Sequence, residues 1–139
     1  MRLSCTVQRA PVPKQRARTV GGKSGKVHSY TPEATVIGET DVWRAWHDQH
    51  ERRGLEFWGD HEPVKLTVEV VLERPASSRR AHPAVRPDLD NYLKLVLDAL
   101  NTWAFRDDGQ VVRIEAWKRY CLPREAPHLT ITIDDDLDG

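Results

Sequence analysis

The sequence predicts an α+β fold in which two helices pack on one mixed or antiparallel sheet of about four to five strands, in the order β-β-α-β-α-β-β. Two patterns carry this prediction. In residues 64–72, apolar residues alternate with lysine, threonine and glutamate, as in a strand with one buried face. In residues 89–100, leucines and a valine recur at helical spacing. A chain of 139 residues has the size of one domain, so we expect a single domain over residues 1–139.

The remaining elements are recognised by local signals. Thr31-Pro32-Glu33 is typical of a helix start, because it combines a capping hydroxyl, a proline at the first helical position and an acid in the first turn. This helix should run to about Arg53. The residues expected to face inward are Val36, Ile37, Trp43 and Trp46. The other predicted strands are Arg2–Val7, Val27–Tyr30, Val111–Tyr120 and His128–Ile133.

Charge is balanced over the whole chain, with 21 Lys plus Arg against 21 Asp plus Glu, but it is unevenly distributed. The first 32 residues hold seven basic residues and no acid. Within them, residues 8–26 also carry prolines and glycines, and we expect a basic flexible loop there. Residues 134–139 are acidic and are predicted to form a disordered tail. No apolar run is long enough to span a bilayer, and the start lacks the features of a secretory signal, so we expect a cytoplasmic protein without membrane contact.

Aspartates stand at two positions where chain segments meet. Asp88 and Asp90 precede the second helix, and the pair Asp107-Asp108 precedes the following strand. Each could simply cap a helix or form a turn. One aspartate suffices for a cap, however, and four carboxylates gathered at one sheet edge would repel each other without a cation. Carboxylate oxygens are the ligands that Mg²⁺ prefers, so the pattern predicts a metal site that acts on phosphate.

Basic residues surround these acids in the sequence. Lys94 lies one helical turn after Asp90, where it could contact a phosphate; an exposed ion pair with Asp90 is an equally good interpretation. Two loops add further positive charge, which a nucleic-acid backbone would need beside acidic groups. The basic residues expected to bind DNA are Lys14, Arg16, Arg18, Lys23, Lys26, Arg79, Arg80 and Arg86.

These motifs together resemble the RusA family of Holliday junction resolvases. The resemblance covers about residues 86–118 and consists of a D-x-D-N-x-x-K segment from Asp88, a D-A-L helix end from Asp98 and a D-D-x-Q-V segment from Asp107. Pro11-Val12-Pro13-Lys14 and Tyr30-Thr31-Pro32 also look like family features.

The resemblance implies a homodimer, often encoded by phages or prophages, that binds a four-way DNA junction and makes paired symmetric nicks with Mg²⁺, for which Mn²⁺ could substitute. It implies catalytic roles for Asp88, Asp90, Asp108 and Lys94. The first three would bind the metal, and Asp107 would be a weaker ligand or would orient one.

Two other functions fit part of the pattern. A protein that binds branched DNA without cutting it could use the basic loops for the backbone and the acids for caps and turns. A D-x-D segment also resembles the nucleotide-sugar metal site of glycosyltransferases, but this chain is short for such an enzyme and lacks a glycine-rich turn between a strand and a helix. Cleavage of a four-way junction would separate the endonuclease from both alternatives.

Overall fold

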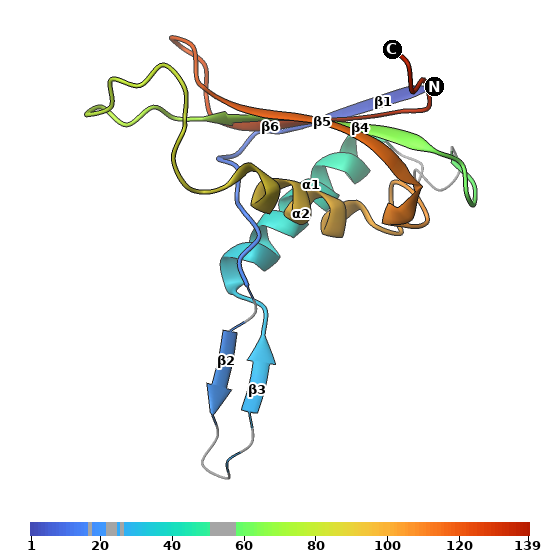
Figure 1. Cartoon of the computed structure of the whole chain (residues 1–139), viewed down its shortest axis with the longest axis horizontal. Helices are drawn as coiled ribbons and strands as arrows, with labels where there is room; N and C mark the ends of the chain where they lie inside the picture. Colours follow the sequence, from blue (N-terminus) through green and yellow to red (C-terminus); the bar gives the residue numbers. More distant parts are fainter. Residues whose placement is uncertain (17, 22–24, 26, 51–57) are drawn as a thin grey trace.

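The computed structural model describes all residues of the chain except 17, 22–24, 26 and 51–57 (Figure 1). The elements are β1 (Arg2–Val7), β2 (Arg18–Gly21), β3 (Val27–Tyr30), α1 (Glu33–Gln49), β4 (Val64–Leu72), α2 (Leu89–Leu100), the short 3₁₀ turn η2 (Asp108–Gln110), β5 (Val111–Tyr120) and β6 (His128–Asp134). Four strands form a sheet in the order β1-β6-β4-β5, and β2 pairs with β3 separately. The α+β prediction is therefore confirmed, with approximately the expected number of strands.

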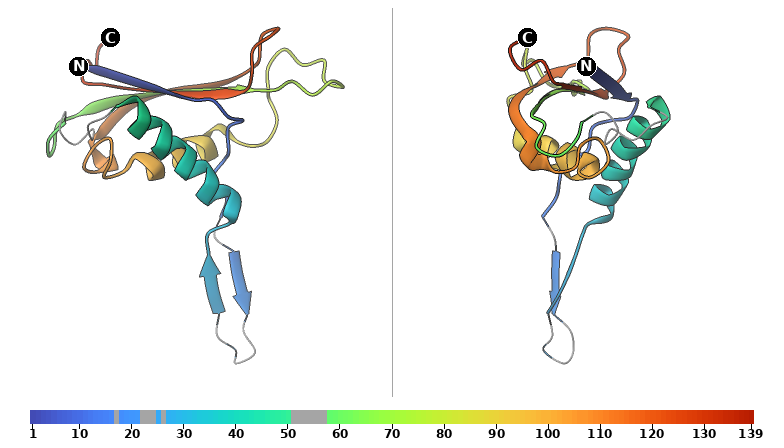
Figure 2. Two further views of the ribbon diagram at one scale, coloured as in Figure 1. Left: turned by 180° about the vertical axis from the view of Figure 1, so that it is seen from behind. Right: turned by 90° about the vertical axis from the view of Figure 1, so that its right-hand side faces the viewer.

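The sheet is mixed, and this determines where α2 lies. β6 runs antiparallel to both β1 and β4, whereas β5 runs parallel to β4. Parallel neighbours require a crossover connection, and α2 provides it. Both helices cover the same face of the sheet (Figure 2). The core lies between them and this face, where Leu66 and Val68 of β4 and Leu100 of α2 are 0% exposed.

The inward face of α1 differs from the prediction. Trp46 is buried, but Val36 and Ile37 are 49% and 46% exposed, and Trp43 is only partly buried. The other buried positions of the helix are Thr35, Gly38 and Val42. Pro32 rather than Thr31 is the N-cap, with no side-chain capping bond, and the helix ends at Gln49 rather than near Arg53. The apolar pattern was right for Trp46 and wrong for Val36 and Ile37, because Thr35 and Gly38 rather than large apolar residues are buried in that part of the helix.

The basic segment of residues 8–26 is more ordered than expected. Arg18–Gly21 forms β2, which pairs antiparallel with β3 in a register that sets Arg18 opposite Tyr30. The two strands form an arm that projects away from the sheet and helices (Figure 1). Lys23 and Lys26 lie outside the described residues. Prolines and glycines predicted a loop here, but they flank the short paired strands instead.

The acidic end of the chain packs on the sheet, contrary to the expected disorder. Asp134 is the last residue of β6, is 4% exposed, and accepts a hydrogen bond from Arg2 Nε at 2.8 Å. Arg113 donates to the backbone carbonyl of Leu137 at 2.6 Å. Basic groups on neighbouring strands thus offset the repulsion among the aspartates. Among the described residues, no helix combines the length and apolarity that crossing a membrane requires.

Candidate active site

The start of α2 presents two carboxylates that the helix does not use. Asp88 is the N-cap residue with extended backbone (φ −69°, ψ 145°), yet its side chain makes no capping hydrogen bond with the described residues. Asp90 lies in the first turn and its side chain is 65% exposed. Within the described residues it contacts Lys94, whose Nζ lies 3.6 Å from Asp90 Oδ2, a weak i,i+4 ion pair. Both carboxylates therefore remain available to a ligand.

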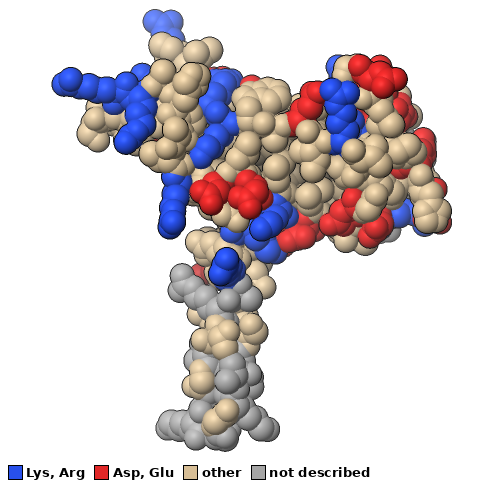
Figure 3. Space-filling view, viewed as in Figure 1, with Lys and Arg blue, Asp and Glu red and all other residues tan. Residues whose placement is uncertain are grey.

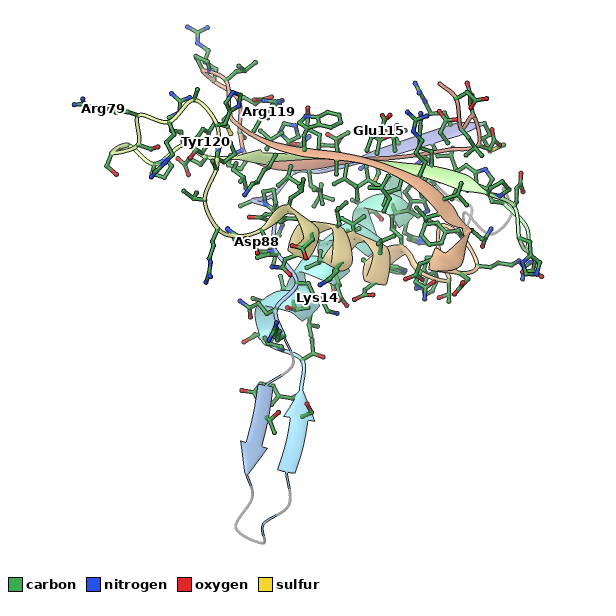
Figure 4. All side chains as sticks on the ribbon, in the orientation of Figure 1. Lys14, Arg79, Asp88, Glu115, Arg119 and Tyr120 are labelled. Atoms are coloured by element: carbon green, nitrogen blue, oxygen red, sulfur yellow. The ribbon has the colours of Figure 1, made fainter. Side chains whose placement is uncertain are left out.

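A cavity of about 730 Å³ opens beside these carboxylates. It is lined by Asp88, Asp90, Asn91 and Lys94 of the α2 region, and by Lys14, Gln15 and Arg16 of the segment before β2. Figure 4 shows Asp88 at the start of α2 and Lys14 nearby, on the chain that leads to β2. The cavity therefore combines acidic groups with cationic ones, which suits a site that holds both a cation and a phosphate.

Asp108 lies at the opposite end of α2. Its backbone N–H donates to Oδ1 of Asn101, the C-cap residue of α2, at 3.1 Å. The 12 residues of α2 thus separate Asp108 from Asp88 and Asp90, and a helix of that length spans roughly 18 Å. In the described part of the chain, no three His, Cys, Asp or Glu residues are grouped so that they could hold one metal ion. The expected meeting of the three aspartates does not occur within one chain.

Asp107 has a local structural role in the turn before β5. Its Oδ2 accepts a hydrogen bond from Gly109 N–H at 2.9 Å, and it forms a capping box with Gln110. A Cβ on Gly109 would lie 2.6 Å from Asp107 Oδ2, so a larger residue at that position would displace the capping carboxylate. One carboxylate oxygen of Asp107 is therefore engaged in this cap.

Two amide side chains that the sequence analysis did not single out position the Asp107-Asp108 turn. Gln110 is 6% exposed. Its Oε1 accepts from the backbone N–H groups of Arg106 and Asp107, at 2.9 and 3.0 Å. Its Nε2 donates to the carbonyls of Gly59 and Glu62, at 2.8 and 3.0 Å. Asn101 supplies the acceptor for Asp108 described above. Only the position of Gln110 in the D-D-x-Q-V segment could have indicated this role.

Lys118, which the sequence analysis also did not single out, fixes the chain that leads into Asp88. Its Nζ donates to the carbonyls of Val85 and Pro87, at 2.7 and 3.0 Å. These bonds join the end of β5 to the loop between β4 and α2. The place of Asp88 therefore depends on β5 as well as on α2.

The predicted DNA-binding residues fall into three groups. Arg79, Arg80 and Arg86 are exposed on the loop between β4 and α2. Figure 3 shows Lys and Arg side chains gathered at this end of the molecule, whereas Asp and Glu are more frequent at the other end of the sheet. Arg16 is exposed at the cavity. The side chain of Arg18 and all of Lys23 and Lys26 lie outside the description.

Lys14 is engaged with protein groups. Its Nζ lies 2.8 Å from Glu39 Oε1 of α1 and 2.8 Å from Asp98 Oδ2 of α2. Partial burial alone would lower the pKa of this amine, but the hydrogen bonds to Asp98 and Glu39 outweigh it and raise the pKa. Lys14 therefore stays charged, with that charge already matched by two carboxylates.

Comparison with known proteins agrees with these features. Residues 9–134 match the family model described as Endodeoxyribonuclease RusA, a family of hydrolases that act on phosphodiester bonds of DNA. The chain is also similar to the uncharacterized protein YqaN of Bacillus subtilis (strain 168), with 34% identity over 83 residues, which is 51% of this chain and 56% of that protein. The chain thus matches little more than half the length of this curated relative. Because the family model spans both the cavity and the Asp107-Asp108 turn, the chain belongs to the RusA family of endodeoxyribonucleases.

Proposed function

We propose that the chain is an endodeoxyribonuclease that resolves four-way DNA junctions by Mg²⁺-dependent hydrolysis of paired phosphodiester bonds, in the cytoplasm. The observation that carries the proposal is the pair of exposed carboxylates of Asp88 and Asp90, which leave the start of α2 uncapped and face a cavity lined by Lys94 and Arg16. An aspartate that served only the helix would accept a hydrogen bond from its first turn.

The donor set at this site fits a hard cation. Asp88 and Asp90 supply carboxylate oxygens, the ligands that Mg²⁺ prefers, and the open cavity leaves space for water and phosphate. Bound magnesium would supply Lewis-acid polarisation of the scissile phosphate. Mn²⁺ accepts similar ligands and could substitute. Asp88 and Asp90 would hold the ion, and Lys94 would exchange its weak contact with Asp90 for a phosphate oxygen and stabilise the negative charge that develops there.

The same residues would orient branched DNA. Arg79, Arg80 and Arg86 lie on the exposed loop that ends at Asp88, so a backbone held by them would enter the cavity from this side. Arg16, which also lines the cavity, would contact it from the segment before β2. Such contacts are mainly electrostatic and would provide affinity without reading bases.

In this proposal, the carboxylate of Asp108 joins those of Asp88 and Asp90 only when a second copy of the chain supplies it. Among the described strands β5 pairs only with β4, so its outer edge is free, and Val112 and Ile114 on it are 59% and 44% exposed. If two β5 strands paired antiparallel with their Ile114 residues at the centre, Arg113 of each copy would lie opposite Glu115 of the other copy. It would also bring the start of one β5, beside Asp108, towards the end of the other β5, where Lys118 holds the chain before Asp88. A homodimer would thus complete two metal sites.

The first prediction tests the activity itself. Wild-type protein should nick a synthetic four-way junction when Mg²⁺ is added and should not nick it in EDTA. Asp90→Asn should bind the junction with at least wild-type affinity but cut it at least about a hundredfold more slowly, because several kcal/mol of charge stabilisation would be lost. Gel assays with branched and linear DNA measure both quantities.

Asp48→Asn is the matched control, because Asp48 is an exposed acid on α1 that does not line the cavity. It should cut at the wild-type rate. Wild-type-like cutting by Asp90→Asn would refute the assignment of Asp90. Binding without cutting by the wild-type protein would favour the alternative, a non-catalytic protein that binds branched DNA.

A further inference from the structure

Residues 11–16, called the strap below, cross both helices between β1 and the β2–β3 arm. The strap is packed closely. A Cβ added to Gly38 of α1 would lie 2.8 Å from Val12 Cβ and 2.9 Å from Leu95 Cδ1 of α2, so Val12 occupies the space that a larger residue at position 38 would need. The backbone N–H of Gln15 donates to Oγ1 of Thr35, which is 0% exposed, at 3.0 Å. The strap is therefore part of the helix layer.

Lys14 holds the strap to both helices at one point. Its backbone N–H donates to the carbonyl of Asn91, in the first turn of α2, at 2.8 Å. Its side-chain ion pairs with Glu39 and Asp98 are both 2.8 Å long, and the Lys14 and Glu39 side chains are only 30% and 28% exposed. One residue thus joins α1, α2 and the chain that carries the arm.

The electrostatics of this cluster argue against direct phosphate binding by Lys14. One cation lies between two carboxylates, so the cluster has a net negative charge and would repel a DNA backbone. To reach a phosphate, the amine would have to leave two short, partly buried ion pairs. Arg16, two residues further along, is exposed and is better placed for that contact.

We propose that Lys14 is a positioning residue, which with Glu39 and Asp98 clamps the strap across α1 and α2 and so holds Arg16 at the cavity of Asp88, Asp90 and Lys94. The importance of this clamp for cleavage rests on the proposed function. The existence of the clamp does not rest on that function, so the clamp and the function can be tested separately.

Amide hydrogen exchange tests the clamp without DNA. In Lys14→Met, exchange at the amides of residues 14 and 15 should accelerate at least about tenfold, because the ion pairs that hold the strap are lost, whereas amides of central β4 should be unaffected. Lys14→Arg should retain the wild-type protection, since a guanidinium can pair with both carboxylates. Unchanged exchange at residues 14 and 15 in Lys14→Met would overturn the clamp.

Asp98→Asn distinguishes positioning from phosphate contact, because the two roles predict opposite effects. If Lys14 bound phosphate, removing a competing carboxylate would tighten junction binding more than the matched control Asp48→Asn does. If Lys14 is a clamp, Asp98→Asn should bind no more tightly than that control but should cut about tenfold more slowly at saturating junction, because the cavity wall is displaced. Tighter binding with an unchanged cutting rate would contradict the proposal. If wild-type protein does not cut but Lys14→Met accelerates exchange, the proposed function fails and the clamp stands.

Discussion

Aspartates of the same type have different roles in this chain, depending on which N–H groups lie close to them. Asp107 accepts the N–H of Gly109 and completes a capping box, so its charge is used to close a turn. Asp88 occupies the equivalent N-cap position of α2 but accepts no such bond from any residue that the structure describes. The sequence could place both residues at the start of a helix or turn, but it could not show which one caps, because that depends on side-chain rotation. The available carboxylate is therefore a structural finding.

Gln110 provides a prediction at the scale of one residue. Gln110→Ala would leave two N–H groups and two carbonyls without their partner at a buried position. Losing such bonds should lower the free energy of unfolding by about 2–4 kcal/mol, as measured by urea denaturation. Gln8→Ala, at an exposed glutamine, should change it by less than about 0.5 kcal/mol. A Gln110→Ala variant as stable as this control would show that the Asp107-Asp108 turn holds without Gln110.

At the scale of elements, the sequence was reliable where one apolar pattern decides the structure. The alternation of residues 64–72 predicted β4, and the helical spacing of residues 89–100 predicted α2. For α1 the sequence placed Trp46 correctly but not Val36 and Ile37, because Gly38 packs there through the absence of a side chain, which no hydrophobic pattern records. It also missed β2, whose partner β3 lies beyond the glycines that were interpreted as flexible. In both cases contacts from elsewhere in the chain override the local signal.

Gly38→Ala tests this interpretation of α1. Alanine should favour an isolated helix by about 1 kcal/mol. Here its Cβ would come within 3 Å of Val12 and Leu95, and overpacking of this kind costs about 1–3 kcal/mol. We expect a net loss of up to about 2 kcal/mol in the free energy of unfolding, measured by thermal or urea denaturation. Gly59→Ala, where a Cβ would meet nothing within 4 Å, should be nearly neutral. Net stabilisation by Gly38→Ala would mean that the strap moves away at little cost.

At the scale of the whole molecule, the candidate site is divided between the two ends of α2. The sequence identified the aspartates by their motifs, and their convergence was inferred from the repulsion expected among four carboxylates. That inference does not hold within one chain, because Asp88 and Asp108 flank the two ends of the same rigid helix. The free edge of β5 instead favours convergence between two chains, and a single sequence cannot reveal that arrangement.

A mixing experiment tests whether two chains share the site. Asp88→Asn and Asp108→Asn should each be inactive alone. In a mixed dimer, one site would carry both substitutions and the other would carry neither, so mixing should restore nicking. Statistical exchange between dimers would leave roughly a quarter of all sites intact, each in a dimer with one active site, so the mixture should give single nicks rather than paired ones.

The matched control is a mixture of Asp88→Asn with Asp90→Asn. Both substitutions lie at the start of α2, so every site in the mixed dimer would lack one carboxylate, and activity should not return. Native mass spectrometry of the mixture establishes that subunits have exchanged. If mixed dimers form and neither pair recovers activity, Asp108 does not complete the site of a second copy. Recovery in the first mixture alone would assign Asp88 and Asp108 to different chains of one site, as we propose from their separation along α2.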